Sequence, residues 1–282
     1  MQTKTHAFIL TTYAKQIKAL NDLIQECKVL LPNNDLSLIR FGGGTALAIY
    51  HFQHRKSFDI DLFVTDPQLL NYLSPKHWLE DSHLFNTAKY IDLANHIRLL
   101  TKENIKIDIL VAQDFIGHPI IDRSKAFFYE DIYVESLEDI LAKKIVYRKD
   151  QNKSRDIIDL GVALYHDALI FEKLLHSEAV SFQDLSDLQD ALKRLDMQRY
   201  LDEIDLVEKN VRNDERIIAY MQKKGCYLDY DRKVSVNRTL KLEKGENESR
   251  LKHLNQRENT VQPIVQVKPE PKAIDQDNGF TM

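Results

Sequence analysis

Apolar residues recur at helical spacing over residues 5–31, and this spacing predicts one long amphipathic helix. A Pro-Asn-Asn run at 32–34 is expected to end it. Cys27 falls on the apolar stripe, which favours a buried thiol over a nucleophile. Residues 36–41 then alternate in the manner of a strand, with Arg40 directed to solvent or to a phosphate.

The most informative pattern lies within residues 41–64, where a glycine run, a short helix and a strand follow one another: FGGGTALAIYHFQHRKSFDIDLFV. The apolar segment 46–52 predicts the helix, and the alternation over 58–64 predicts the strand. Side chains two residues apart on a strand point to the same side of the sheet. Asp59 and Asp61 are therefore expected to share one face, opposite an apolar one.

Two neighbouring carboxylates repel each other and favour a cation between them, and hard oxygen ligands select Mg²⁺ or Mn²⁺. The glycine run complements this pair, because glycines let backbone N–H groups approach an anion and a helix N-terminus favours negative charge. Thr45 can cap that helix or hydrogen-bond a phosphate oxygen. A glycine run alone is most often a turn, and paired aspartates alone are commonly a solvent-facing edge. Their combination within one short stretch is much less common.

Further strands are predicted in the middle of the chain. Short helices are expected at 67–72 and 76–80, and residues 83–111 indicate two or three strands. The runs 96–100 and 105–111 flank a polar turn and predict a hairpin.

Asp108 lies on the second strand of that hairpin. Its neighbours Ile105, Ile107 and Ile109 share the apolar face, so the aspartate projects from the other side. A lone carboxylate there, close to an acidic site, is a functional candidate. From the residues alone, a solvated aspartate on an edge strand is an equally good interpretation.

The second half of the chain is predicted to be mainly helical. After a possible strand at 127–134, Ser136 opens a helix to about Arg148 with a pattern resembling a capping box. A second helix is expected over 155–166, and helical apolar spacing continues over 169–221. We interpret these segments as a helical lobe.

Composition narrows the class of protein. The 282 residues permit one large domain or two, and 43% hydrophobic with 29% charged residues fits a soluble globular chain. The net charge of −4 confines any nucleic-acid contact to a local patch. Two distant cysteines indicate a reducing compartment, and the sequence shows neither a signal peptide nor an apolar run of ~20 residues. We therefore expect a cytoplasmic protein without a membrane partner.

Two stretches resemble a known family. The run GGGTALAIYHFQHRKSFDIDLFV resembles the first motif of the DNA polymerase β-like nucleotidyltransferase superfamily, and in particular that of AbiEii/AbiGii-type toxin nucleotidyltransferases, with their GGTAL, HR-x-S and D-x-D-L-F pattern. The later run LAKKIVYRKDQNKSRDIIDL resembles the distal motif of the same toxins. The resemblance covers the first half and the middle of the chain.

The resemblance implies an α+β fold, in which a minimal mixed β-sheet with flanking helices is followed by a C-terminal helical lobe. We expect a nucleotidyltransferase core over residues 1–135 and the helical lobe over 136–230. Residues 231–282 are rich in Lys, Glu, Asn, Gln and Pro toward their end, and we expect them to form a disordered tail.

The resemblance also implies site residues. The expected ligands of Mg²⁺ or Mn²⁺ are Asp59, Asp61 and Asp108. The catalytic set would be these three aspartates with Lys144 and Asp159. Contacts to the nucleotide would come from Gly43, Gly44, Thr45, Arg55, Ser57, Lys144, Arg148, Arg155 and Asp156. For Asp156, a salt bridge within a charged helical hairpin is an equal alternative, whereas for Lys144 a function on the triphosphate is favoured.

The expected reaction moves a nucleoside monophosphate from an NTP to a hydroxyl acceptor, with Asp108 as general base. By the resemblance, the protein would be the toxin of a toxin–antitoxin or phage-defence pair, with tRNA or another RNA as the leading acceptor and an antitoxin protein as a possible partner. A basic patch over 143–155 is expected to grip that acceptor. A protein-modifying enzyme and a non-catalytic nucleotide- or RNA-binding module remain the alternatives.

Overall fold

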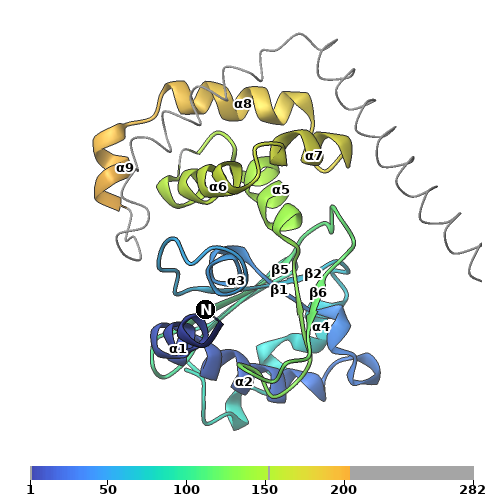
Figure 1. Cartoon of the computed structure of the whole chain (residues 1–282). Coiled ribbons are helices and arrows are strands. Elements are labelled where there is room, and N and C mark those ends of the chain that lie inside the picture. The colour runs from blue at the N-terminus through green and yellow to red at the C-terminus, as the bar shows by residue number, and fades with distance from the viewer. Residues whose placement is uncertain (1, 152, 204–282) are drawn as a thin grey trace, which may run out of the picture. The chain divides into compact units, whose positions relative to one another are not determined.

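The computed structural model describes residues 2–151 and 153–203, which belong to one compact unit of the chain (Figure 1). The expected tail at 231–282 and the end of the helical lobe lie outside the described residues. None of the described helices is long and apolar enough to cross a bilayer.

The first half contains both helices and strands, and the described part of the second half contains helices alone. The α-helices are α1 (Gln2–Thr12), α2 (Ala14–Lys28), α3 (Gly43–Tyr50), α4 (Leu69–Leu73), α5 (Leu137–Arg148), α6 (Ser154–His166), α7 (Ile170–His176), α8 (Phe182–Lys193) and α9 (Met197–Glu203). The strands are β1 (Arg40–Gly42), β2 (Ile60–Val64), β3 (Ile91–Leu93), β4 (His96–Leu100), β5 (Lys106–Val111), β6 (Ile120–Asp122) and β7 (Ile132–Val134).

The strands form one mixed sheet in the order β3-β4-β5-β2-β1-β7-β6. Strand β2 lies near its centre, antiparallel to β1 and parallel to β5, and the predicted β4–β5 hairpin is present. Helix α3 packs against β1 and β2. The mixed sheet followed by a run of helices confirms the predicted α+β fold class.

The N-terminal segment differs from the prediction of one helix, because the chain bends between α1 and α2 at Tyr13. This residue leaves helical geometry with φ −111° and ψ 17°. Its ring is fully buried, and its hydroxyl donates to the carbonyl of Arg55 at 3.3 Å. A tertiary contact therefore interrupts a pattern that is continuous in sequence. Cys27 is buried, as predicted.

Three predicted strands are shorter than expected. The segment 36–41 begins with the 3₁₀ turn Leu36–Leu38, stabilised by the Asp35 carboxylate accepting from the Ser37 N–H, before β1. Strand β2 starts at Ile60, so Asp59 lies in the loop that precedes it. The segment 127–134 contributes only β7, and its partner β6 was not predicted, because three residues carry too little alternation.

The described core consists of two hydrophobic clusters. The first joins the sheet to α1–α4, and the second lies among α5–α9. Helix α5, which is capped by Ser136 as predicted, supplies Ile140 to the first cluster and Leu141 and Ile145 to the second. The expected domain boundary at 135/136 stays a prediction.

Candidate active site

The glycine turn lies directly against the acidic strand. Gly43 has φ +67°, a conformation that favours glycine, and a Cβ added there would lie 2.1 Å from Asp61 Oδ2. A Cβ on Gly44 would lie 2.5 Å from Arg55 Nη2 and 2.7 Å from Ser57 Oγ. Only backbone fits at these two positions, which brings the N-terminus of α3 next to the carboxylate of Asp61.

Gly43→Ala should therefore lower both stability and activity. A left-handed alanine alone is expected to cost about 1–3 kcal/mol, and the added methyl group would also displace Asp61. Gly117→Ala is a matched control, because Gly117 has φ +77° but open space around its Cα. Thermal unfolding should show the larger drop for Gly43→Ala; equal drops would mean that the close approach to Asp61 contributes nothing.

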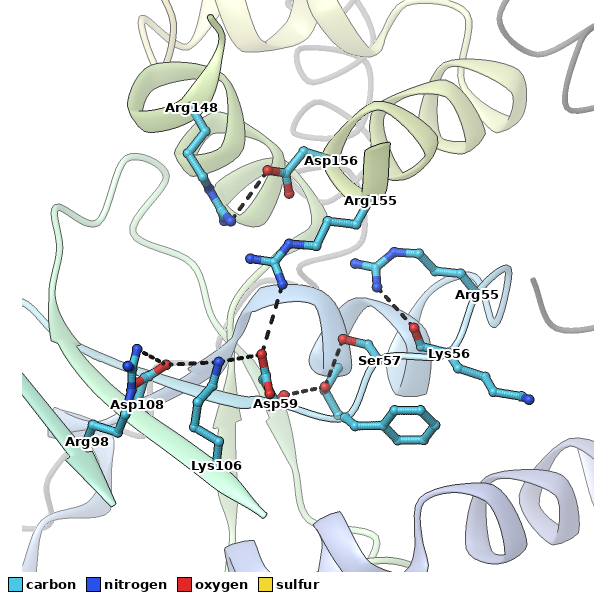
Figure 2. A network of polar contacts seen from close by, with 12 residues as sticks. Arg55, Lys56, Ser57, Asp59, Arg98, Lys106, Asp108, Arg148, Arg155 and Asp156 are labelled. Carbon is cyan, nitrogen blue, oxygen red and sulfur yellow. Dashed lines mark hydrogen bonds and ion pairs between the residues drawn. The ribbon is translucent and has the colours of Figure 1, made fainter. Parts of the chain in front are cut away.

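Two of the three candidate carboxylates come from adjacent strands. Strands β2 and β5 are parallel, and Asp61 and Asp108 are partners in their register. Asp59 lies two residues before Asp61, at the end of the preceding loop. Its Oδ2 contacts Lys106 Nζ at 2.5 Å and lies 4.0 Å from Arg155 Nη1 (Figure 2).

Asp108 is surrounded by basic groups. Its Oδ1 lies 2.8 Å from His96 Nε2 and accepts from Arg98 Nε at 2.6 Å, while its Oδ2 lies 3.7 Å from Lys106 Nζ. Burial acts to raise the pKa of Asp108, but the hydrogen bonds from Arg98 and His96 outweigh it and hold the pKa below its usual value.

Asp61 has the opposite electrostatic environment. Removal from water raises its pKa, and the like charges of Asp108 and Asp59 add to this rise. The positive charges of Lys144 and Arg148 act against it. The charge of ionised Asp61 is thus less well compensated than that of Asp108.

These donors suit a hard cation in type, but those of Asp59 and Asp108 are engaged with protein cations. Within residues 2–151 and 153–203, no three His, Cys, Asp or Glu side chains converge as a metal-binding group. Carboxylate oxygens are the ligands that Mg²⁺ and Mn²⁺ prefer. The ammonium of Lys106 lies between Asp59 and Asp108, so the space between these two carboxylates already holds a cation. By donor type, the carboxylates of Asp59, Asp61 and Asp108 fit the expected metal.

A second, buried network surrounds Asp159. Its carboxylate has no solvent exposure and accepts from Arg55 through Nε at 2.6 Å and Nη2 at 2.8 Å. His54 Nε2 lies at 2.6 Å and Lys144 Nζ at 2.9 Å. Burial acts to raise the pKa of Asp159, but the charges of Lys144 and Arg55 hold it well below the usual value. The network joins the loop after α3 to helices α5 and α6.

The structure places several of the predicted site residues in buried polar contacts. Asp159 is fully buried, and Lys144 is 3% exposed and also bonded to Asp156 at 2.7 Å. The guanidinium of Arg55 is directed to Asp159 rather than to a phosphate. Thr45 is fully buried, with its hydroxyl between Ser57 Oγ at 3.1 Å and the carbonyl of Asp59. These four buried side chains therefore support the site from the interior of the protein.

The expected basic patch over 143–155 is also smaller than predicted. Lys143 is buried, with Nζ 2.6 Å from both Glu135 Oε1 and Asp139 Oδ2. Arg155 is about half exposed and points toward Asp59, while Arg148 lies 3.4 Å from Asp156 (Figure 2). Arg155 and Arg148 are therefore the partly exposed arginines of this patch, whereas Lys143 and Lys144 are buried.

Glu135 predicts a measurable dependence of stability on pH. Burial raises the pKa of its carboxyl to about 8, despite Lys143, and its Oε2 has no hydrogen-bond partner among the described residues. The folded state therefore holds a proton that the unfolded state has lost, so stability falls as pH rises from about 4.5 to about 8. Glu135→Gln cannot lose that proton.

In thermal melts from pH 5 to pH 9, Glu135→Gln should resemble the wild type at the acidic end. Its melting temperature should exceed that of the wild type by on the order of 5 °C near pH 8. If the melting temperatures of the two proteins changed in parallel with pH, the raised pKa of Glu135 would be contradicted.

Sequence reasoning missed the basic partners of the carboxylates. Lys106 shares a strand face with Asp108, and Arg98 is the register partner of Asp108 in the predicted hairpin. Alternation and hairpin register could have found both. His96 lies two residues before Arg98 on β4, so the same alternation places it on that face.

The glycine turn and the acidic strand pair lie within the part of the chain that matches a known family. The sequence profile described as "Nucleotidyl transferase AbiEii toxin, Type IV TA system" matches residues 33–223, more than half of the chain. The chain belongs to this family of toxin nucleotidyltransferases, which confirms the resemblance seen in the two motifs.

Solved structures similar in fold include JHP933 from Helicobacter pylori, with 17% identity, a TM-score of 0.44, and 84% of this chain and 95% of that chain covered. Another is MenT4, a nucleotidyltransferase toxin from Mycobacterium tuberculosis, with 16% identity, a TM-score of 0.45, and 81% and 91% covered. None of the curated proteins matches the chain.

Proposed function

We propose that this protein transfers a nucleoside monophosphate from an NTP to a hydroxyl of tRNA or another RNA. The observation that carries the proposal is the register pairing of Asp61 with Asp108, beside Asp59 and the glycine turn. Three carboxylates next to a helix N-terminus suit a reaction in which a polyphosphate and a cation must meet.

In this proposal Asp59, Asp61 and Asp108 hold Mg²⁺ or Mn²⁺. A bound divalent ion would stabilise the charge that develops on the attacking and leaving oxygens. The backbone of Gly43 and Gly44 approaches the phosphates of the nucleotide, and Ser57 lies at the same turn. Asp108 accepts the proton of the attacking hydroxyl.

The basic residues divide into two groups by exposure. Arg148 and Arg155 are the side chains that contact the polyphosphate or the RNA backbone, because their guanidinium groups reach the surface. Lys144 acts through its charge, which opposes the rise in the pKa of Asp61. Asp159 and Asp156 hold Lys144 in place and are positioning residues rather than catalytic ones.

The biological role proposed is that of the toxin in a cytoplasmic toxin–antitoxin or phage-defence pair, with an antitoxin as partner. NTPs and tRNA are both available in that compartment. Phosphate contacts from a few arginines weaken with rising salt, so labelling of RNA should fall as salt increases.

The acceptor can be identified by incubating the full chain with each α-labelled NTP, Mg²⁺ and a cell lysate, followed by ribonuclease or protease. Label that ribonuclease removes from a tRNA-sized band supports the proposal. Label that only protease removes would make the protein-modifying alternative correct. Nucleotide binding without any labelled product would support the non-catalytic module.

A further inference from the structure

Lys106 lies between two of the three carboxylates that would hold the metal of the proposed reaction. Its Nζ is 2.5 Å from Asp59 Oδ2 and 3.7 Å from Asp108 Oδ2, so one oxygen of each carboxylate faces the same ammonium (Figure 2). A divalent ion that joined these two oxygens would occupy the same space. The two cations therefore exclude each other.

The other cations around these carboxylates are placed differently. Arg98 donates from Nε to Asp108 Oδ1 and from Nη2 to Asp108 Oδ2 at 3.3 Å, which fixes its guanidinium, and His96 also contacts Oδ1. Arg155 is 4.0 Å from Asp59. Among these cations, Lys106 is the one that reaches both carboxylates, and it does so through its Nζ.

Lys106 can also leave. Its side chain is 32% exposed and has a flexible four-carbon stem, so the ammonium has a path to water. Departure of Lys106 would leave Asp108 oriented, because Arg98 and His96 hold its other oxygen. Asp59 Oδ2 would then be available to another cation, together with Asp108 Oδ2, which Arg98 Nη2 still contacts at 3.3 Å.

We propose that Lys106 is a built-in competitor of the divalent metal at the Asp59–Asp108 pair, which weakens binding of the metal alone and couples its entry to that of the nucleotide. This inference rests on the proposed metal-dependent function. The triphosphate brings negative charge that favours the metal and offers the displaced ammonium a new partner.

The test is Mn²⁺ binding to the full chain without nucleotide, followed at constant pH by the electron paramagnetic resonance signal of free Mn²⁺. Lys106→Met and Lys106→Gln should each bind Mn²⁺ about tenfold more tightly than the wild type, corresponding to about 1.4 kcal/mol. Lys102→Met is a matched control, because it removes an exposed lysine from the neighbouring turn. Its affinity for Mn²⁺ should equal that of the wild type.

Adding Asp59→Asn to Lys106→Met should remove the gain, which assigns the metal to this pair. Equal or weaker binding by both Lys106 variants, beside measurable binding by the wild type, would overturn the competition while leaving the proposed reaction intact. Absence of Mn²⁺ binding by every protein, both Lys106 variants included, would also overturn the competition. Circular dichroism of each variant confirms that folded protein is compared.

Discussion

Asp61→Asn should abolish nucleotidyl transfer while leaving the protein at least as stable as the wild type. The carboxylate of Asp61 lies against the glycine turn and pairs in register with Asp108. Loss of an electrostatic group that acts at the reacting phosphate typically costs about 10²–10³-fold in rate, and a metal ligand should cost at least that. Product formation measured in single-turnover assays gives the loss directly.

The stability half of this prediction follows from the raised pKa of Asp61. When the pKa of a carboxyl is higher in the folded than in the unfolded state, the protein loses stability as pH rises through the folded pKa. Asparagine removes the charge, so the variant should gain stability relative to the wild type on going from pH 4 to pH 7. Asp190→Asn, on the exposed side of α8, is the control and should change neither property. Full activity of Asp61→Asn would remove Asp61 from the site.

Asp159→Ala should be the most destabilising single change among those considered. It leaves the nitrogens of His54, Arg55 and Lys144 buried without their shared acceptor. Breaking a buried ion pair from one side costs about 3–5 kcal/mol, which corresponds to a fall of roughly 10 °C in the melting temperature for a domain of this size. Urea unfolding measures the loss.

The dependence on pH gives this second prediction its own signature. The pKa of Asp159 is depressed in the folded state, so its contribution is present above the unfolded pKa, near 3.8, and is lost as pH falls below it. The difference in the free energy of unfolding between wild type and Asp159→Ala should therefore decrease at acidic pH. Asp190→Ala provides the exposed control, and a loss no larger than that of the control would show that the network does not hold the site.

The elements that sequence predicted best are those specified by neighbouring residues. The glycine turn, α3 and β2 follow from glycines, an apolar run and alternation within one stretch. The N-cap at Ser136 and the β4–β5 hairpin are local as well. The bend at Tyr13 could not be predicted, because its cause is a core position and a hydrogen bond to Arg55, far along the chain.

The same distinction explains the site. Strand alternation placed Asp61 and Asp108 on the polar side of the sheet, but their register required the order of strands. The burial of Lys143 and Lys144 depends on acceptors from other segments, Glu135 for the first and Asp159 for the second. The helical pattern of the sequence predicts both lysines to be exposed at the surface, because it contains no information on distant partners.

The central claim, transfer of a nucleoside monophosphate, is tested most directly by the fate of the two ends of the triphosphate. The purified full chain is incubated with Mg²⁺, tRNA and each NTP, labelled in either the α- or the γ-phosphate. The account predicts that tRNA acquires label only from the α-phosphate, with release of pyrophosphate, and that Asp61→Asn gives no labelled product. Label transferred from the γ-phosphate, or equal labelling by Asp61→Asn, would contradict it.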